Sequence, residues 1–188
     1  MTTAGVDLYW LPLGAGGHCV RLSGKAFEAL AAAAGGRARC DLYHSALVVG
    51  APAGRYAIEQ APVAKGDPAA RGAVAGGAVG SRVLQRLRPF RYEVRCWRDG
   101  VIPDLTEAID SPLRLSDDPG VAGRLLELVP SVPTPVWGRD ELGAGEMWNS
   151  NSVVSWLLVR CGIDAASVPL PARGRAPGWQ AGVAVARR

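Results

Sequence analysis

The sequence predicts an α+β fold, in which a small antiparallel sheet packs against one central helix late in the chain. Strand-like segments separated by glycine-rich turns predict the sheet, and residues 153–161, which end at Gly162, are the most apolar helical run. The 188 residues are 48% hydrophobic, enough to bury one ordinary core. We therefore expect a single domain spanning residues 1–188.

Four segments have the composition of β-strands. Residues 6–13 are apolar and aromatic, and residues 90–97 alternate apolar and polar side chains. Residues 42–49 are apolar and β-branched, and the Gly/Pro loop at 50–54 returns the chain into residues 55–61. The last two segments are expected to form a hairpin.

Three segments predict helices. Residues 25–34 are good helix formers that stop at a Gly-Gly pair, and residues 121–129 follow an Asp-Pro-Gly start signal. Residues 153–161 form the central helix.

Two long segments are predicted to be irregular. Residues 64–81 are rich in glycine and nearly match a dinucleotide-binding fingerprint at 75–80. They lack the first glycine and a preceding apolar strand, so they indicate a loop rather than a nucleotide site. Residues 104–115 are acidic and irregular.

Composition argues against several classes of protein. No stretch approaches the roughly 20 apolar residues of a membrane span, and the N-terminus lacks a signal-peptide pattern. The four cysteines (Cys19, Cys40, Cys96 and Cys161) have no metal-ligand or C-x-x-C spacing. We expect free thiols, no metal, no cofactor and a cytoplasmic location. The net charge of +4 comes almost wholly from arginine and favours no particular ligand.

The polar run 149–152 (Asn-Ser-Asn-Ser) stands at the start of the apolar helix. Asn and Ser are preferred N-caps, so capping alone explains the run. The functional alternative places the Ser150 hydroxyl at the positive helix end, beside backbone N–H groups that would stabilise an oxyanion. Cys40 and Cys161 are weaker nucleophile candidates, better explained as inert thiols.

Together with Tyr-His-Ser-Ala-Leu-Val-Val at 43–49, this polar run resembles the circularly permuted papain-like fold. The most similar pattern is that of the PPPDE group, which includes desumoylating isopeptidases, with NlpC/P60-like and lecithin retinol acyltransferase-like proteins as wider relatives. In that group a strand carries a His followed by small and apolar residues, and a late Asn-Cys-Asn segment starts the nucleophile helix. The Asn-Ser-Asn version is similar to that of some bacterial families. The opening strand and the proline-rich segment 168–171 also fit, so the resemblance spans nearly the whole chain.

The resemblance implies that His44 is the general base and that Ser150 replaces the usual cysteine nucleophile. A helix dipole does not ionise a serine hydroxyl, so Ser150 needs His44 within hydrogen-bond reach. Folding the hairpin about its Ala-Pro pair would bring Glu59 or Gln60 across from His44, which would complete a Ser-His-acid triad. The expected partner is a peptide, amide or acyl substrate, with hydrolysis and transfer both open.

Trp148, Asn149 and Asn151 are the expected substrate-binding residues. Trp148 precedes the polar run and would line either a substrate groove or the core. The side-chain amide of Asn149 or of Asn151 would help to stabilise the oxyanion. His18, in the glycine-rich turn, is a weaker alternative to His44.

The sequence is compatible with two other functions. The Cys-to-Ser replacement would also suit a catalytically inactive protein of the same fold that binds a peptide or lipid. A nucleic-acid interface is the less favoured possibility, suggested by six arginines interleaved with aromatic residues and followed closely by acidic ones. Those arginines are Arg82, Arg86, Arg88, Arg91, Arg95 and Arg98. The pattern leaves the oligomeric state open.

Overall fold

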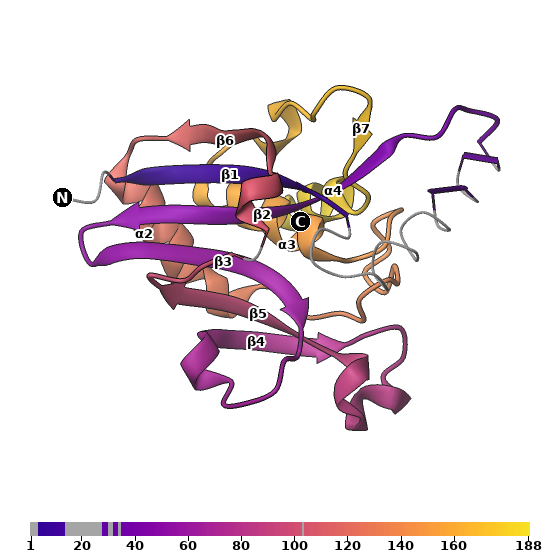
Figure 1. Cartoon of the computed structure of the whole chain (residues 1–188), viewed down its shortest axis with the longest axis horizontal. Helices are drawn as coiled ribbons and strands as arrows, with labels where there is room; N and C mark the ends of the chain where they lie inside the picture. Colours follow the sequence, from indigo (N-terminus) through magenta and orange to yellow (C-terminus); the bar gives the residue numbers. More distant parts are fainter. Residues whose placement is uncertain (1–3, 14–27, 30–31, 34, 103) are drawn as a thin grey trace.

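An antiparallel sheet with helices on one face dominates this computed structural model (Figure 1). The structure describes residues 4–13, 28–29, 32–33, 35–102 and 104–188. The strands are β1 (Gly5–Pro12), β2 (Asp41–Ala51), β3 (Gly54–Pro62), β4 (Ala73–Ala78), β5 (Arg91–Arg98), β6 (Ile109–Ser116) and β7 (Gly174–Arg175). Their order is β4-β5-β3-β2-β1-β6, and β7 pairs with β2 in parallel. The α+β class is confirmed.

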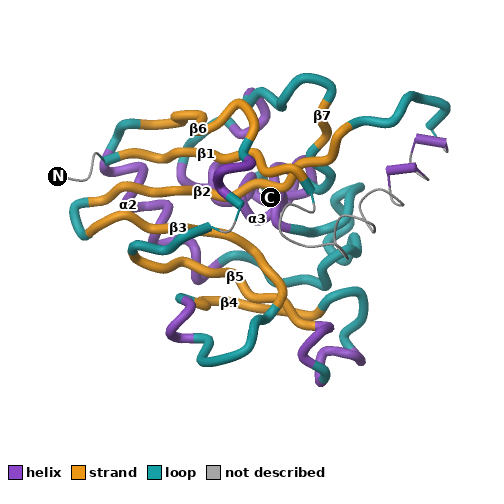
Figure 2. The backbone as a smooth tube through the Cα atoms, in the orientation of Figure 1, coloured by secondary structure: helices purple, strands orange, loops and turns teal. Residues whose placement is uncertain are grey.

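Three helices lie behind the sheet in the view of Figure 2 and cover one of its faces. They are α2 (Pro119–Leu128), α3 (Ser150–Cys161) and α4 (Trp179–Ala186). The main core forms where Trp10, Leu47 and Val49 of the sheet meet Leu125 and Leu157 of the helices. No helix in the described part of the chain combines the length and apolar character that crossing a bilayer requires.

The opposite face of the sheet carries a second, smaller core. Leu11, Ala46, Val48 and Ala57 form it together with Ile102, which belongs to the connection between β5 and β6. Side chains alternate between the two faces of a strand, so β2 contributes to both cores. Odd-numbered β2 residues from 43 to 49 face the helices, and even-numbered ones face away.

Strand β2 changes partner along its length. It pairs with β3 from Ala51 as far as Leu47, whose partner is Ile58. Its first two residues, Asp41 and Leu42, pair instead with β7. Residues 43–46 therefore have β1 on one side but no strand on the other within the described structure.

Most predicted elements are confirmed, but two are wrong. Residues 73–78 of the predicted loop 64–81 form edge strand β4, and the predicted irregular segment 104–115 contains most of edge strand β6. Helix α3 begins at Ser150 rather than at residue 153, since the polar run supplies its first turn. Most of the predicted helix 25–34 lies outside the described residues.

Helices α3 and α4 approach each other closely at a glycine. A Cβ atom at Gly182 would overlap the Ser152 carbonyl oxygen and the Ser155 hydroxyl. The Ser155 hydroxyl also donates to the Trp179 carbonyl at 2.7 Å, which ties the two helices together. Only a residue without a side chain fits at position 182.

We expect Gly182→Ala to lower the free energy of unfolding by about 1–3 kcal/mol, because the new methyl group overpacks the interface. Gly123→Ala in α2 is the matched control, since a Cβ there meets no atom within 4 Å. The control should raise stability by roughly 0.5–1 kcal/mol through helix propensity. Urea unfolding of both variants checks this, and equal stability of the two would contradict the close approach.

Candidate functional site

The polar run 149–152 forms a reciprocal cap on α3. The Asn149 side chain accepts hydrogen bonds from the backbone N–H groups of Asn151 (2.9 Å) and Ser152 (3.4 Å). In return, the Ser152 hydroxyl accepts from the Asn149 N–H at 3.1 Å. This is the capping-box arrangement, which satisfies N–H groups that the helix leaves unpaired. Those N–H groups are thereby withdrawn from any oxyanion hole.

The Asn151 amide joins α3 to the part of β2 that has lost its strand partner. Its Nδ2 donates to the Tyr43 carbonyl at 3.0 Å and to the Pro177 carbonyl at 2.9 Å. Its Oδ1 accepts from the Ser45 hydroxyl at 2.9 Å. Asn151 is 2% exposed, so each of these bonds satisfies a polar group shielded from water.

Two further side chains of the run bind the turn before α4. Asn149 Nδ2 donates to the Pro177 carbonyl at 2.8 Å, and the Ser152 hydroxyl donates to the Gly178 carbonyl at 2.7 Å. Asn149, Asn151 and Ser152 are thus structural residues in this geometry.

Ser150 differs from its neighbours. It occupies the first position of α3 and is 6% exposed, yet its hydroxyl makes no hydrogen bond to any described residue. Its place at a helix N-terminus is the one that the sequence predicted. A serine there still needs a base to remove its proton during attack.

His44 lies on the other face of β2. It pairs with Leu11 of β1, and directly opposed residues of an antiparallel pair point to the same side. Leu11 belongs to the small core, as do the β2 neighbours Ala46 and Val48, so His44 faces away from α3. Ser45, not His44, reaches the first turn of α3. The structure therefore does not bring His44 and Ser150 together.

Burial controls the protonation of His44. Desolvation lowers its pKa from 6.5 to about 4, and the negative charge of Asp104 opposes this only in part. The imidazole is consequently neutral near pH 7.

Glu59 shares a face with His44 but binds Arg95 instead. Its Oε1 accepts from Arg95 Nη1 at 2.9 Å, and Arg95 also contacts Glu93, which in turn binds Arg71. Burial raises the pKa of Glu59, while Arg95 pulls it down. The hairpin turn also differs from the expected one, since Ala51 pairs with Gly54 and the register sets neither Glu59 nor Gln60 opposite His44.

Gln60 and Trp148 are both buried. The Gln60 amide and the Trp148 indole N–H make no hydrogen bond to the described residues. Trp148 is 2% exposed and belongs to the main core, so it does not line an open groove.

The cysteines described by the structure are free thiols. Burial raises the pKa of Cys96 to about 11 and also raises that of Cys161, so both remain protonated at neutral pH. Cys19 and His18 lie outside the described residues. His, Cys, Asp and Glu side chains of the described chain form no group of three that could hold a metal ion.

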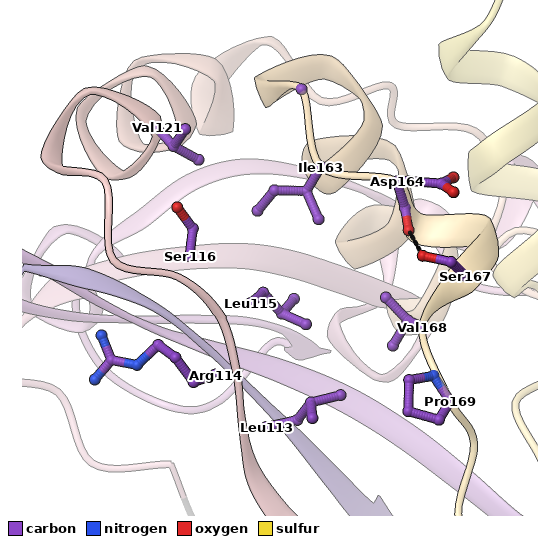
Figure 3. A pocket seen from close by; sticks show the side chains of 11 residues that line it. Leu113, Arg114, Leu115, Ser116, Val121, Ile163, Asp164, Ser167, Val168 and Pro169 are labelled. Carbon is purple, nitrogen blue, oxygen red and sulfur yellow. Dashed lines mark hydrogen bonds between the residues drawn. The ribbon is translucent and has the colours of Figure 1, made fainter.

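An open groove lies at the β6 edge of the sheet (Figure 3). Its volume is about 520 Å³, and it runs between β6, α2 and the segment that follows α3. The apolar side chains of Leu115, Ile163 and Val168 point into it, and a hydrogen bond between Ser167 and the Asp164 carbonyl marks its rim. No sequence pattern predicts this groove, because the segments that form it are far apart in the chain.

The fold defines an α+β protein whose antiparallel sheet has helices on one face and a smaller core on the other. No protein-family model, curated protein or solved structure matched the chain in the three comparisons.

We predict that the desolvated imidazole of His44 makes the stability of the protein fall in acid. The folded pKa of about 4 lies below the ordinary 6.5, so the unfolded chain binds the extra proton between these values. This contribution is complete above about pH 6.5 and is lost as the pH falls towards 4. The stability advantage of the wild type over His44→Gln should shrink by up to about 3 kcal/mol across that window.

Urea unfolding at several pH values measures this difference, in which the other titrating groups cancel. Parallel curves for the two proteins would show that His44 is solvated and titrates normally.

Proposed function

We propose that the protein is a catalytically inactive binding protein of the circularly permuted papain-like class, and that it binds an extended peptide. One observation supports the absence of catalysis. The first turn of α3 lies against β2, but His44 projects from the opposite face of that strand. The contact between a late helix and an early histidine strand supports the class. The orientation of the histidine supports the inactivity.

Two further elements of acyl transfer, the backbone N–H groups after Ser150 and the expected acid, are engaged elsewhere. Asn149 occupies the N–H groups of Asn151 and Ser152, and Arg95 occupies the carboxylate of Glu59. A Ser nucleophile without an adjacent base gains little from a helix N-terminus alone.

The groove beside β6 is the proposed binding site. β6 is an edge strand, so the backbone groups of residues 113–116 that point away from β1 have no strand partner in the described structure. An extended peptide that pairs with such an edge places alternate side chains into an adjoining groove. Leu115, Ile163 and Val168 provide the apolar floor. A peptide suits this site better than an alkyl chain, because only a peptide satisfies the strand edge.

We predict that a fluorophosphonate serine-hydrolase probe will not label Ser150, because His44 does not activate the hydroxyl. Purified wild type, Ser150→Ala and His44→Ala are incubated with the probe, beside an active serine protease as positive control, and adducts are mapped by mass spectrometry. The expected result is no Ser150 adduct in any of them. An adduct at Ser150 that disappears in His44→Ala would establish a hydrolase and overturn the proposal.

We predict that filling the groove weakens peptide binding. Linear peptides are first selected against the wild type from a random phage-displayed library. Their affinity for Ser167→Trp should be lower by about tenfold or more. Ser167 is exposed at the groove rim, so the indole occupies the groove without disturbing the core.

Ala166→Trp is the matched control, because Ala166 is exposed on the same turn but does not line the groove. Peptides that bind both variants equally well, or a library that yields no binders, would count against this site.

A further inference from the structure

The connection between β4 and β5 projects from the lower edge of the sheet in Figure 1 and is exposed along most of its length. It contains two short 3₁₀ helices, Val83–Arg86 and Arg88–Phe90. We refer to residues 82–91, together with Lys65 of the neighbouring loop, as the basic tip. Its apolar and charged side chains have no role in the groove or around Ser150.

Aliphatic side chains are unusually exposed on the basic tip. Val83 is 82% exposed, Leu87 56% and Leu84 40%. A cluster of three aliphatic side chains on one short projection is a feature of surfaces that contact a protein or a membrane.

The basic tip that carries these aliphatic residues also carries unneutralised cations. Lys65, Arg86, Arg88 and Arg91 border one open depression, and none of them forms an ion pair with a described residue. Arg71 borders the same depression but is held by Glu93. The nearest loop contributes one carboxylate, Asp67, which accepts from the Ala69 N–H. Positive charge therefore dominates.

We propose that the basic tip attaches the protein peripherally to membranes that contain anionic lipids. Insertion of aliphatic side chains and attraction of cations to lipid phosphates reinforce each other, and peripheral proteins commonly need two such signals. Val83, Leu84 and Leu87 supply the first signal, and the four free cations supply the second. This attachment is independent of the proposed peptide groove.

The kind of exposed apolar residue favours lipid over nucleic acid. Proteins that bind single strands stack bases on exposed aromatic rings. Tyr92 is buried with its hydroxyl bonded to the Pro135 carbonyl, and Phe90 and Trp97 are partly buried. The side chains that project among the free arginines are aliphatic, which suits an acyl-chain boundary.

Co-sedimentation with vesicles tests the proposal. Full-length protein is mixed with vesicles of equal parts phosphatidylserine and phosphatidylcholine, or with phosphatidylcholine alone. We expect binding to the anionic vesicles only, weakened by added salt. Arg86→Gln/Arg88→Gln/Arg91→Gln should reduce the partition coefficient on the order of a hundredfold, since each charge contributes about fivefold. Val83→Ser/Leu87→Ser should reduce the partition coefficient by roughly severalfold or more.

The matched control removes the same charge elsewhere. Arg39, Arg98 and Arg173 are exposed and lie outside the basic tip, with Arg98 at the opposite end of β5 from Arg91, so their replacement by Gln should leave much of the binding intact. Equal loss in the control would show that only net charge matters and would overturn the assignment to the tip. Binding to single-stranded DNA without binding to anionic vesicles would also overturn it, as would failure to bind either. Circular dichroism confirms that each variant is folded.

Discussion

The hydrogen bonds of the Asn151 amide hold the start of α3 against strand β2 and against the turn before α4. β2 pairs with β7 at Asp41 and Leu42 and with β3 from Leu47 onward, so between them the Tyr43 carbonyl has no strand partner on that side in the described structure. An unsatisfied buried carbonyl is costly. Asn151 satisfies it and binds Pro177 with the same amide group. A single side chain thus positions the start of α3 against the sheet and against the turn that begins α4. The close approach at Gly182 follows from that placement.

The same constraint decides the orientation of His44. Ser45 must face the helices to donate to Asn151, and adjacent residues of a strand point to opposite faces. His44 therefore turns into the smaller core, where burial depresses its pKa. A shift of one residue in the β1–β2 register would exchange Ser45 and His44, but it would also move Leu47 and Val49 out of the main core. The packing of the main core thus keeps His44 on the face of β2 that points away from Ser150.

Sequence periodicity predicted the elements of the core better than those at the sheet edges. Strands β1, β2, β3 and β5 and helices α2 and α3 have clear apolar patterns, whereas β4 is built of small residues and β6 contains Pro112. Capping chemistry correctly placed Ser150 at a helix start. The face of His44 could not be read, because residues 42–49 are largely apolar on both sides and both sides of β2 are covered. The groove beside β6 could not be predicted either, because it forms from segments that are far apart in the sequence.

The fold pairs some arginines of the basic stretch with carboxylates and leaves others unpaired within the part of the chain that the structure describes. In the sequence the six between residues 82 and 98 form a single basic stretch. In the fold, Arg95 lies nearly buried on the sheet and is bound by two carboxylates, since a buried cation needs paired partners. One of these is Glu59, so the acid expected to orient His44 instead neutralises Arg95. Arg82 is matched by Glu141, while Arg86, Arg88 and Arg91 form no ion pair with the residues that the structure describes. These three arginines thus stand in the same short projection as the exposed aliphatic side chains of Val83, Leu84 and Leu87.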